Sequence, residues 1–428
     1  MMHDGTSRSD AIVGSARIPI ARSHTAYKNA SNLDMMSATL KALVDKYQLA
    51  GQTLGDVSLG AVIEHSRDWN LAREAVLSSG LSPNTPAFDL QRACGTSLSG
   101  CVMIANRIAL GQIDAGIGAG TDTVSDPPIV YDDEYRSIMM ASYRGRSFGQ
   151  RFKPWLGLRP RHFKPVLPGV EEPRTKLSMG QSTEITAKEW QITREEQDAL
   201  ALASHQKAEA AYAEGFYDDL IVPFEGLSKD NNVRADSSME KLAKRKPVFD
   251  RSGAGTMTAG NSTPRTDGAA SILRASEDWA RERGLPVLAY LDFCKVAAVD
   301  FVNEEGLLMA PAYAVSDMLT DAGLSLQDFD FYEIHEAFAA QALATMKAWE
   351  SAEFCRNKLG RDAPLGSIDR DKLNVKGGSL AMGHPFAATG GRIVGALAKL
   401  LHQKGSGRGL VSICTAGGMG GTAILSAP

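Results

Sequence analysis

The chain has 428 residues, with 46 Lys and Arg against 50 Asp and Glu, and a formal net charge of −4. This near-neutral balance provides no overall electrostatic attraction to nucleic acid. Hydrophobic residues make up 43% of the chain and charged residues 22%, a composition that excludes an intrinsically disordered protein and predicts a large buried core.

The cysteine pattern predicts free thiols. There are five cysteines with no C-x-x-C pair, namely Cys94, Cys101, Cys294, Cys355 and Cys414. Neither a disulfide framework nor a structural zinc site is expected from this pattern. No apolar run reaches the roughly 18 residues of a membrane-spanning helix, and the N-terminal MMHDGTSRSD lacks the apolar stretch of a secretory signal. We therefore expect a cytoplasmic location, or another reducing compartment, and no secretion.

Strand-like and helix-like stretches alternate along the chain, which is typical of an α/β fold. The pattern predicts, in order, a strand over 10–18, a helix over 33–47, a strand over 58–64, an extended segment over 86–92, a helix over 97–110 and a buried strand over 115–119. Polar helical sequence follows over 176–216, with an N-cap at Ser178 or Ser182. Strand-like sequence resumes at 255–259, and a last α/β unit begins at 286.

The middle of the chain differs in composition from both ends. The segment 136–164 contains eight Lys and Arg residues, five interleaved aromatic residues, and no Asp or Glu. The stretch 125–250 is therefore interpreted as an insertion between two α/β halves.

Two turns near opposite ends of the chain have related sequences. C-G-T-S-L-S-G begins at Cys94 and H-P-F-A-A-T-G begins at His384, and both place a hydroxyl residue five positions on and a glycine six positions on. Each turn precedes a helix-like stretch and then a small-residue strand, over 115–120 and 410–415. This pattern indicates duplicated halves that each present a reactive side chain at a strand-to-helix turn, with chance similarity as the alternative.

Cys94 and His384 carry groups suited to nucleophilic catalysis. A helix N-terminus stabilises a thiolate and lowers the pKa of a cysteine, although a cysteine in this position is also often a small buried apolar residue. His384, held between Gly383 and Pro385, has an imidazole able to take a thiol proton. A structural histidine is the alternative.

Two further segments are candidates for the same site. The glycines after Cys414 let backbone amides approach a ligand, unless they form only a tight turn. His335 opens the sequence H-E-A-F, and because Ala339 stands where a zinc-protease motif needs a second histidine, no zinc site is expected. The His335 imidazole is instead suited to donate a hydrogen bond to a developing oxyanion.

These segments resemble the signatures of the thiolase family. The Cys94 turn resembles its nucleophile motif, 374–392 its second signature, 414–420 its third, and 258–270 the segment that closes its N-terminal half. The resemblance spans nearly the whole chain. It implies an α/β fold of duplicated α-β-α-β-α architecture, with two five-stranded halves at 1–124 plus 251–285 and at 286–428, and a CoA-binding loop domain inserted over 125–250.

Three departures from the commonest thiolase pattern indicate a subgroup. The sequences H-E-A-F at 335–338, L-L-M-A-P at 307–311 and T-A-G-G after Cys414 resemble 3-ketoacyl-CoA thiolases, the beta subunits of trifunctional fatty-acid oxidation complexes. The resemblance implies an acyltransferase of beta-oxidation that cleaves 3-ketoacyl-CoA into acetyl-CoA and a shortened acyl-CoA. The alternatives are a biosynthetic acetoacetyl-CoA thiolase, a decarboxylating ketoacyl synthase and a non-catalytic lipid-binding protein of the same fold.

The resemblance also assigns catalytic roles. Cys94 would attack the 3-keto carbon, His384 would take its proton, and Cys414 would protonate the acetyl-CoA enolate and then deprotonate CoA. The backbone N–H groups of Cys94 and Ala416 would form one oxyanion hole. His384 and His335 would form the other.

Further expectations from the resemblance concern ligands and partners. Met179, Ser262, Thr263 and Phe338 match substrate-binding positions; coenzyme A is a co-substrate, with no metal and no tightly bound cofactor. A homodimer or dimer of dimers is implied, with a hydratase/dehydrogenase alpha subunit as a candidate partner and no nucleic acid. For the basic aromatic segment 136–164, solvated surface, contact with CoA phosphates, and docking to a membrane or partner subunit remain open.

Overall fold

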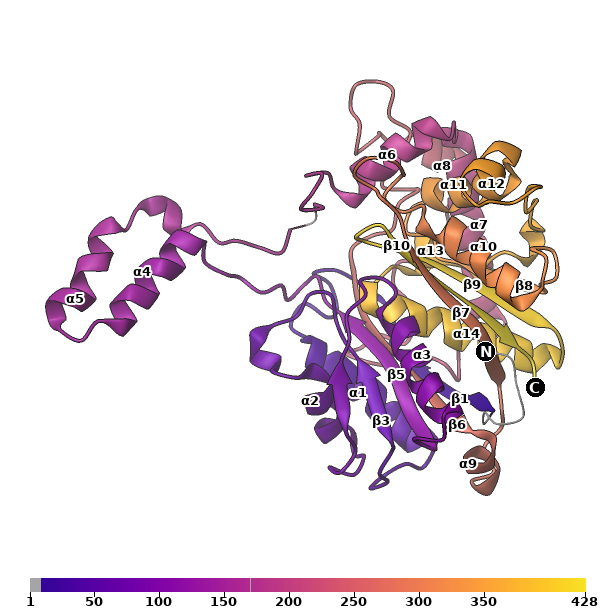
Figure 1. Cartoon of the computed structure of the whole chain (residues 1–428), viewed down its shortest axis with the longest axis horizontal. Coiled ribbons are helices and arrows are strands. Elements are labelled where there is room, and N and C mark those ends of the chain that lie inside the picture. Colours follow the sequence, from indigo (N-terminus) through magenta and orange to yellow (C-terminus); the bar gives the residue numbers. More distant parts are fainter. Residues whose placement is uncertain (1–8, 170) are drawn as a thin grey trace.

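The computed structural model describes residues 9–169 and 171–428. Residues 1–8, on which the expected absence of a secretory signal largely rests, lie outside the described part. A mixed sheet of order β4-β3-β5-β6-β1-β7-β10-β9-β8 runs through the body of the molecule (Figure 1). No helix in the described residues has the length and apolar character needed to cross a bilayer.

Five strands belong to the first half of the chain: β1 (Asp10–Arg17), β3 (Asp56–Leu59), β4 (Ala87–Asp89), β5 (Ala115–Asp122) and β6 (Thr266–Ser276). The short β2 (Ala21–Arg22) pairs with β6. The helices α1 (Asn32–Lys46) and α2 (Leu71–Ser79) cover one face, where Met35, Leu40 and Leu43 of α1 pack in a core with Ile117 of β5. Helix α3 (Thr96–Ala109) also packs on this sheet.

The second half contributes β7 (Ala289–Ala298), β8 (Phe331–Ile334), β9 (Arg408–Thr415) and β10 (Met419–Ser426). Within the described residues these are four strands, not the five expected. The halves join where Ala11 and Ile12 of β1 pair with Tyr290 and Ala289 of β7. Helices α10 (Ala310–Ala322) and α11 (Ala339–Glu350) pack in an outer core of this half.

Helices α3 and α14 (Thr389–Lys404) form the central layer of the molecule. Leu98 of α3 and Ile393 of α14 share an apolar cluster with Ile272 from the first half and Val411 from the second. Helices thus lie on both outer faces and between the halves, which confirms the predicted α/β fold class with its α-β-α-β-α layers.

The chain between β5 and β6 has two parts. Helices α4 (Asp133–Arg144) and α5 (Phe148–Phe152), with the 3₁₀ turns η2 (Lys153–Gly157) and η3 (Pro160–Phe163), form an arm that projects from the body (Figure 1). Helices α6 (Met179–Glu189), α7 (Arg194–Ala213) and α8 (Met239–Ala243) lie over the second half. Ser178 is the N-cap of α6, as the sequence predicted. The remaining short elements are η1 (Ser66–Asp68), α9 (Glu277–Glu282), α12 (Ala352–Asn357), η4 (Arg370–Lys372), α13 (Ser379–Met382) and η5 (Phe386–Ala388).

Two predicted strands differ from the structure because buried carboxylates accept hydrogen bonds from backbone N–H groups of these segments. Residues 255–259 form no strand, since the N–H groups of Thr256 and Met257 donate to the Glu184 carboxylate. The strand predicted over 58–64 ends early at Leu59. Just beyond it, the N–H groups of residues 62 and 63 donate to Asp122.

Candidate active site

The first turns of α3 and α14 meet, and this contact places Cys94 beside His384. Cys94 directly precedes Gly95, the N-cap of α3, and His384 lies in the loop before η5 and α14. A Cβ atom added to Gly390 would lie 2.6 Å from the backbone N of Leu98. Only a glycine therefore allows the two helices to approach this closely, because real Cβ atoms do not tolerate such a contact.

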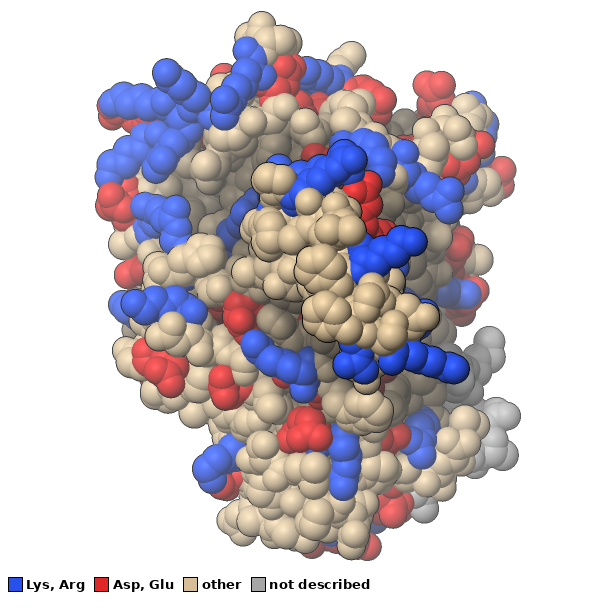
Figure 2. Space-filling view, turned by 90° about the vertical axis from the view of Figure 1, so that its left-hand side faces the viewer, with Lys and Arg blue, Asp and Glu red and all other residues tan. Residues whose placement is uncertain are grey.

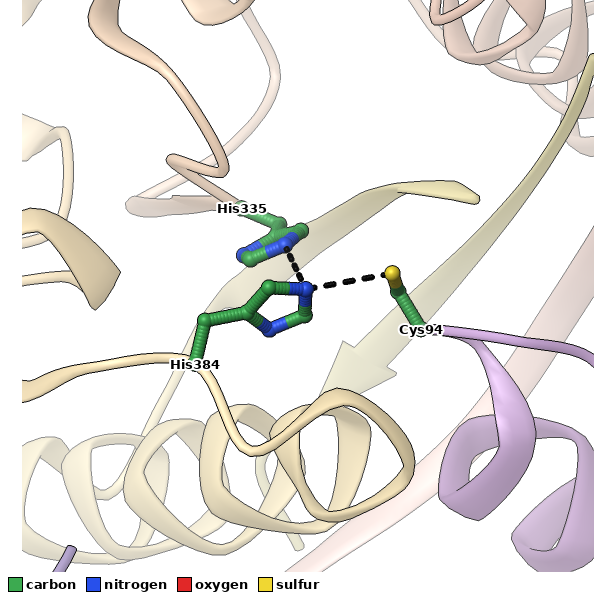
Figure 3. Close-up of side chains that lie close together, drawn as sticks. All are labelled: Cys94, His335 and His384. Carbon is green, nitrogen blue, oxygen red and sulfur yellow. Dashed lines mark hydrogen bonds between the residues drawn. The ribbon is translucent and has the colours of Figure 1, made fainter. Parts of the chain in front are cut away.

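Three side chains converge at this point (Figure 3). The Nε2 atom of His384 lies 3.1 Å from the Sγ of Cys94 and 3.3 Å from the Nε2 of His335. His335 directly follows β8. Three segments that are distant in the sequence thus bring a thiol and two imidazoles into hydrogen-bonding contact.

Two hydroxyl groups fix the histidine rings from behind. The Nδ1 of His384 lies 2.6 Å from Thr389 Oγ1, and the Nδ1 of His335 lies 2.9 Å from Ser379 Oγ. Ser379 Oγ also accepts a hydrogen bond from Arg392. The sequence analysis noticed a hydroxyl residue five positions after His384 but gave Thr389 no role, and it missed Ser379, for which the sequence carries no separate signal.

The resting thiol and imidazoles are neutral. Burial, with a further contribution from the charge of Asp122, raises the pKa of Cys94 to about 12, although the N–H groups of Ala416 and Cys94 itself oppose the shift. The lowered pKa expected at a helix N-terminus is therefore wrong for the resting protein, because desolvation outweighs the helix dipole. Burial, followed by the charge of Arg392, lowers the pKa of His384 to about 3. Burial and the neighbouring His384 likewise lower the pKa of His335 well below its usual value.

Cys414 lies in a buried apolar cluster at the end of β9. Leu307, Leu308 and Ala337 surround it, with Met179 and Phe338 packed at the edge. Burial, and then the charge of Cys94, raises the pKa of Cys414 well above its usual value. The turn after Cys414 lies against the Cys94 site, because the Ala416 N–H lowers the pKa of Cys94, the charge of Cys94 raises the pKa of Cys414, and a Cβ added to Gly95 would lie 3.0 Å from the Thr415 side chain.

The turn after Cys414 has the conformation that its glycines allow. Gly417 and Gly418 have φ angles of 78° and 69°, which only glycine adopts at little cost. The N–H of Gly417 donates a 2.7 Å hydrogen bond to the carboxylate of Glu172, from the segment between β5 and β6. Sequence reasoning missed Glu172.

The four positions expected to bind substrate lie near the segment 337–338. Met179 and Phe338 border the Cys414 cluster. Thr263 donates through both its backbone N–H and its hydroxyl to the Ala337 carbonyl. Ser262 pairs with Phe338 in an antiparallel backbone β-bridge. The Ser262 hydroxyl oxygen is buried and has no hydrogen-bond partner in the structure.

A polar clamp, also missed from the sequence, holds the backbone at His335. The Asn374 side chain accepts from the Ile334 N–H and donates to the Ile334 carbonyl and to the Glu336 carboxylate. Glu336 also accepts from the Ser204 hydroxyl. Asn374 lies in the second signature, but only the structure shows what its side chain binds.

The same three side chains form the one group within the described residues that could hold a metal ion. The ligand atoms of Cys94, His335 and His384 all lie within 4.8 Å of one another.

Two family descriptions match the chain over almost its whole length. The description "Thiolase, N-terminal domain" matches residues 11–278, and "Thiolase, C-terminal domain" matches residues 285–427. The chain belongs to the thiolase family. Membership makes this thiolase an acyltransferase and confirms the resemblance drawn from the sequence.

Named relatives and solved structures agree with this assignment. The thiolase is 41% identical over 428 residues to a 3-ketoacyl-CoA thiolase of Pectobacterium carotovorum. The alignment covers 98% of this chain and 97% of the relative. A 3-ketoacyl-CoA thiolase of Yersinia pestis is 40% identical over 420 residues, covering 97% and 96%. Among structures, an acetyl-CoA acetyltransferase of Bacillus anthracis superposes with a TM-score of 0.82 at 31% identity, covering 99% of this chain and 100% of that one. An Ascaris suum thiolase in complex with coenzyme A superposes with a TM-score of 0.80 at 26% identity, covering 98% and 100%.

Proposed function

We propose that this protein is a 3-ketoacyl-CoA thiolase, which cleaves 3-ketoacyl-CoA into acetyl-CoA and a shortened acyl-CoA in fatty-acid beta-oxidation. The contact between the Cys94 thiol and the His384 imidazole, 3.1 Å apart, is the observation that carries the proposal. The names of relatives at 40% and 41% identity support the substrate class.

In the first half-reaction Cys94 acts as the nucleophile. Its Sγ attacks the 3-keto carbon while His384 Nε2 takes the thiol proton. The C2–C3 bond then breaks, leaving the acyl group on Cys94 and its electron pair on C2 as the acetyl-CoA enolate. Cys414 protonates C2 and becomes a thiolate. Because the Cys94 and His384 groups are both neutral at rest, proton transfer accompanies the attack.

The second half-reaction restores every proton. The Cys414 thiolate takes the proton of an incoming CoA thiol, and the CoA sulfur attacks the acyl group on Cys94. The released Cys94 sulfur recovers its proton from His384. A thioester intermediate suits this exchange, because one thioester is converted into another.

Hydrogen-bond donors are available for both developing oxyanions. The N–H groups of Cys94 and Ala416, which favour the Cys94 thiolate, would stabilise the oxyanion formed at the 3-keto carbon. His335 and His384 would stabilise the enolate oxygen. Loss of one such donor typically lowers the rate by about 10²–10³-fold.

Coenzyme A would bind between the inserted segment 125–250 and the two halves at 1–124 plus 251–285 and at 286–428. Met179 and Phe338 border the Cys414 cluster, where an acyl or pantetheine chain would pack. The buried Ser262 hydroxyl, which has no partner, and the neighbouring Thr263 would lie along the pantetheine. The Ascaris suum relative was solved with coenzyme A.

A panel of 3-ketoacyl-CoA substrates tests the proposal. Thiolysis is measured on short, medium, long and sterol-derived chains, with acyl-Cys94 detected by mass spectrometry and Cys94→Ala as the control. Cleavage of several chain lengths with acylation at Cys94 supports the proposal. Activity confined to acetoacetyl-CoA would indicate the biosynthetic alternative, and absence of acyl-Cys94 with every substrate would indicate a non-catalytic protein.

The projecting arm supports a second, peripheral role: contact with an anionic membrane surface. Helix α4 buries none of its residues, and Tyr143, Phe148 and Leu156 are 82%, 84% and 74% exposed. Figure 2 shows Lys and Arg side chains around uncharged ones on this face of the molecule. Exposed aromatic residues with interspersed cations suit an anionic lipid interface.

Vesicle sedimentation tests this role. Binding to anionic but not zwitterionic vesicles, reduced by salt and by Phe148→Ser, is expected, with thiolysis unchanged. Equal binding to anionic and zwitterionic vesicles would overturn this role. Binding of the arm to a hydratase/dehydrogenase subunit in place of lipid would indicate the partner alternative.

The compartment is proposed from the cysteines, and the assembly from membership of the thiolase family. All five cysteines of the sequence lie within the described residues and are free thiols, which suits a reducing compartment such as the cytoplasm. A homodimer or dimer of dimers is expected, and light scattering of the purified chain measures it.

A further inference from the structure

We propose that Cys94, His335 and His384 bind a zinc ion, and that zinc thereby inhibits the free enzyme reversibly. The site is formed by this chain's two histidines and its reactive thiol. It departs from the sequence expectation of no metal. The inhibition rests on the proposed thiolysis, whereas the binding itself does not depend on which substrate is cleaved.

The spacing of the three ligand atoms is close to that of a zinc site. Zn–N bonds of about 2.0–2.1 Å and Zn–S bonds of about 2.3 Å in a tetrahedral arrangement place two nitrogens about 3.3 Å apart and nitrogen and sulfur about 3.6 Å apart. The two Nε2 atoms lie 3.3 Å apart, and Cys94 Sγ lies 3.1 Å from His384 Nε2. All three atoms fall within 4.8 Å of one another, so a side-chain shift of about 1 Å at Cys94 completes the geometry.

The hydroxyl groups behind the rings can accept the two Nδ1 protons, and that tautomer leaves both Nε2 atoms free for a metal. Metal-binding histidines usually donate their other ring N–H to an acceptor. Here Thr389 Oγ1 lies 2.6 Å from the Nδ1 of His384, and Ser379 Oγ lies 2.9 Å from the Nδ1 of His335. Although Ser379 also accepts from Arg392, a hydroxyl oxygen has two lone pairs and can accept both N–H groups.

In the zinc-bound form both Nδ1 atoms would carry the ring proton, and both Nε2 lone pairs, 3.3 Å apart, would point at the ion. Without zinc, one Nε2–H can donate to the other Nε2. A thiolate and two neutral imidazoles suit zinc better than magnesium or calcium, which prefer oxygen ligands. Binding replaces the Cys94 S–H bond by an S–Zn bond and releases one proton, and a water molecule would occupy the fourth position.

Zinc binding and catalysis exclude each other at this site. An acylated Cys94 has no thiolate to offer, and a zinc-bound Cys94 cannot attack a carbonyl. Zinc is therefore expected to compete with 3-ketoacyl-CoA for the free enzyme, and a chelator is expected to restore activity.

Metal titration of the full-length chain tests the binding directly. Zinc is added to metal-free protein in competition with a chromophoric chelator, and one ion per chain is expected. Thr389→Val, which removes a hydrogen-bond partner of a ligand, should weaken zinc binding by roughly 10- to 100-fold. Cys94→Ala and His335→Asn remove ligands themselves and should each weaken it by more. Cys294→Ser and His402→Asn are the matched controls, because they remove the same side-chain types outside the site and should leave the affinity unchanged.

A second measurement uses the wild-type chain and so does not depend on how the variants fold. Iodoacetamide alkylation at Cys94 and Cys294 is followed by mass spectrometry with and without zinc. Protection of Cys94 but not of Cys294, reversed by chelator, is expected. Affinity that is the same in Cys94→Ala as in wild type, or alkylation of Cys94 that zinc does not slow, overturns the proposal even if the protein proves to be an active thiolase.

Discussion

The backbone N–H of Gly391 donates a 2.7 Å hydrogen bond to the side-chain oxygen of Ser97, 294 residues away along the chain. Ser97 lies in the first turn of α3 and Gly391 in the first turn of α14. The bond therefore joins the two helices at the ends that carry Cys94 and His384. This hydrogen bond therefore both stabilises the packing of α3 against α14 and holds Cys94 and His384 in alignment.

Ser97→Ala is expected to lower both stability and activity. The buried N–H of Gly391 would lose its acceptor, which costs about 1–3 kcal/mol of unfolding free energy. Denaturant unfolding measures that cost, and thiolysis should fall because the 3.1 Å contact between Cys94 and His384 loosens. Ser137→Ala removes an exposed hydroxyl on the arm and serves as the control. A Ser97→Ala protein with full stability would contradict this account of the helix contact.

Gly390→Ala should separate the two helices more severely. The added Cβ would lie 2.6 Å from the backbone N of Leu98, and backbone atoms cannot move aside as a flexible side chain can. Because a displacement of about 1 Å in a catalytic group can cost about 10²-fold in rate, we expect a fall in kcat of that order. Gly149→Ala, where an added Cβ meets no atom within 4 Å, should have normal kcat. Equal rates in both variants would rule out the close approach.

Alkylation of the free enzyme should report the raised pKa of Cys94. With that pKa near 12, the thiolate fraction grows about tenfold for each pH unit up to about pH 10, because the thiol remains mostly protonated throughout. The rate of iodoacetamide labelling at Cys94 should rise accordingly without reaching a plateau. A plateau near neutral pH would instead indicate a preformed thiolate–imidazolium pair.

The sequence predicted the reactive groups better than it predicted what surrounds them. Cys94, His384 and Cys414 each stand in a glycine-rich turn, so local sequence was enough to single them out. The helices α1 and α3 followed from the local sequence pattern, and the family fold followed from the resemblance of the motifs to thiolase signatures. In each case the signal lies within a short stretch of chain.

What the sequence did not reveal depends on contacts between distant segments. Nothing near 379 indicates that Ser379 faces His335, and nothing near 255–259 indicates that Glu184 takes the hydrogen bonds a strand would need. The direction of the Cys94 pKa shift was also wrong, because burial is a property of the folded protein. Such features follow from tertiary packing rather than from local pattern.

Thr389 should act as a positioning residue. Its hydroxyl lies 2.6 Å from the Nδ1 of His384, so Thr389→Val removes the group that fixes the ring while keeping the side-chain shape. We expect kcat to fall by about 10- to 100-fold, less than the roughly 10²–10⁴-fold that a general base contributes, because the base is displaced rather than removed, with KM little changed. Thr389→Ser, which keeps the hydroxyl, should restore most of the rate. If it did not, a purely steric role would explain the effect.

Glu333 should make the folded protein less stable as the pH rises. It lies in β8, two residues before His335, and burial raises its pKa to about 8, partly offset by the charge of Arg392. Between its unfolded pKa of about 4.3 and the folded value, the native state retains a proton that the unfolded chain has lost. Stability contributed by this group is therefore fully present below the lower pKa and is lost as the pH rises through the upper one.

Glu333→Gln imitates the protonated form and should remove this dependence. Its melting temperature should exceed that of wild type at about pH 9 and match it at about pH 4, just below the unfolded pKa. Glu353→Gln, a change at an exposed glutamate on α12, should leave the difference between the two pH values as in wild type. If Glu333→Gln lost stability equally at both pH values, protonation of Glu333 would not govern the pH response. The carboxyl group would then be held by hydrogen bonds that glutamine cannot replace.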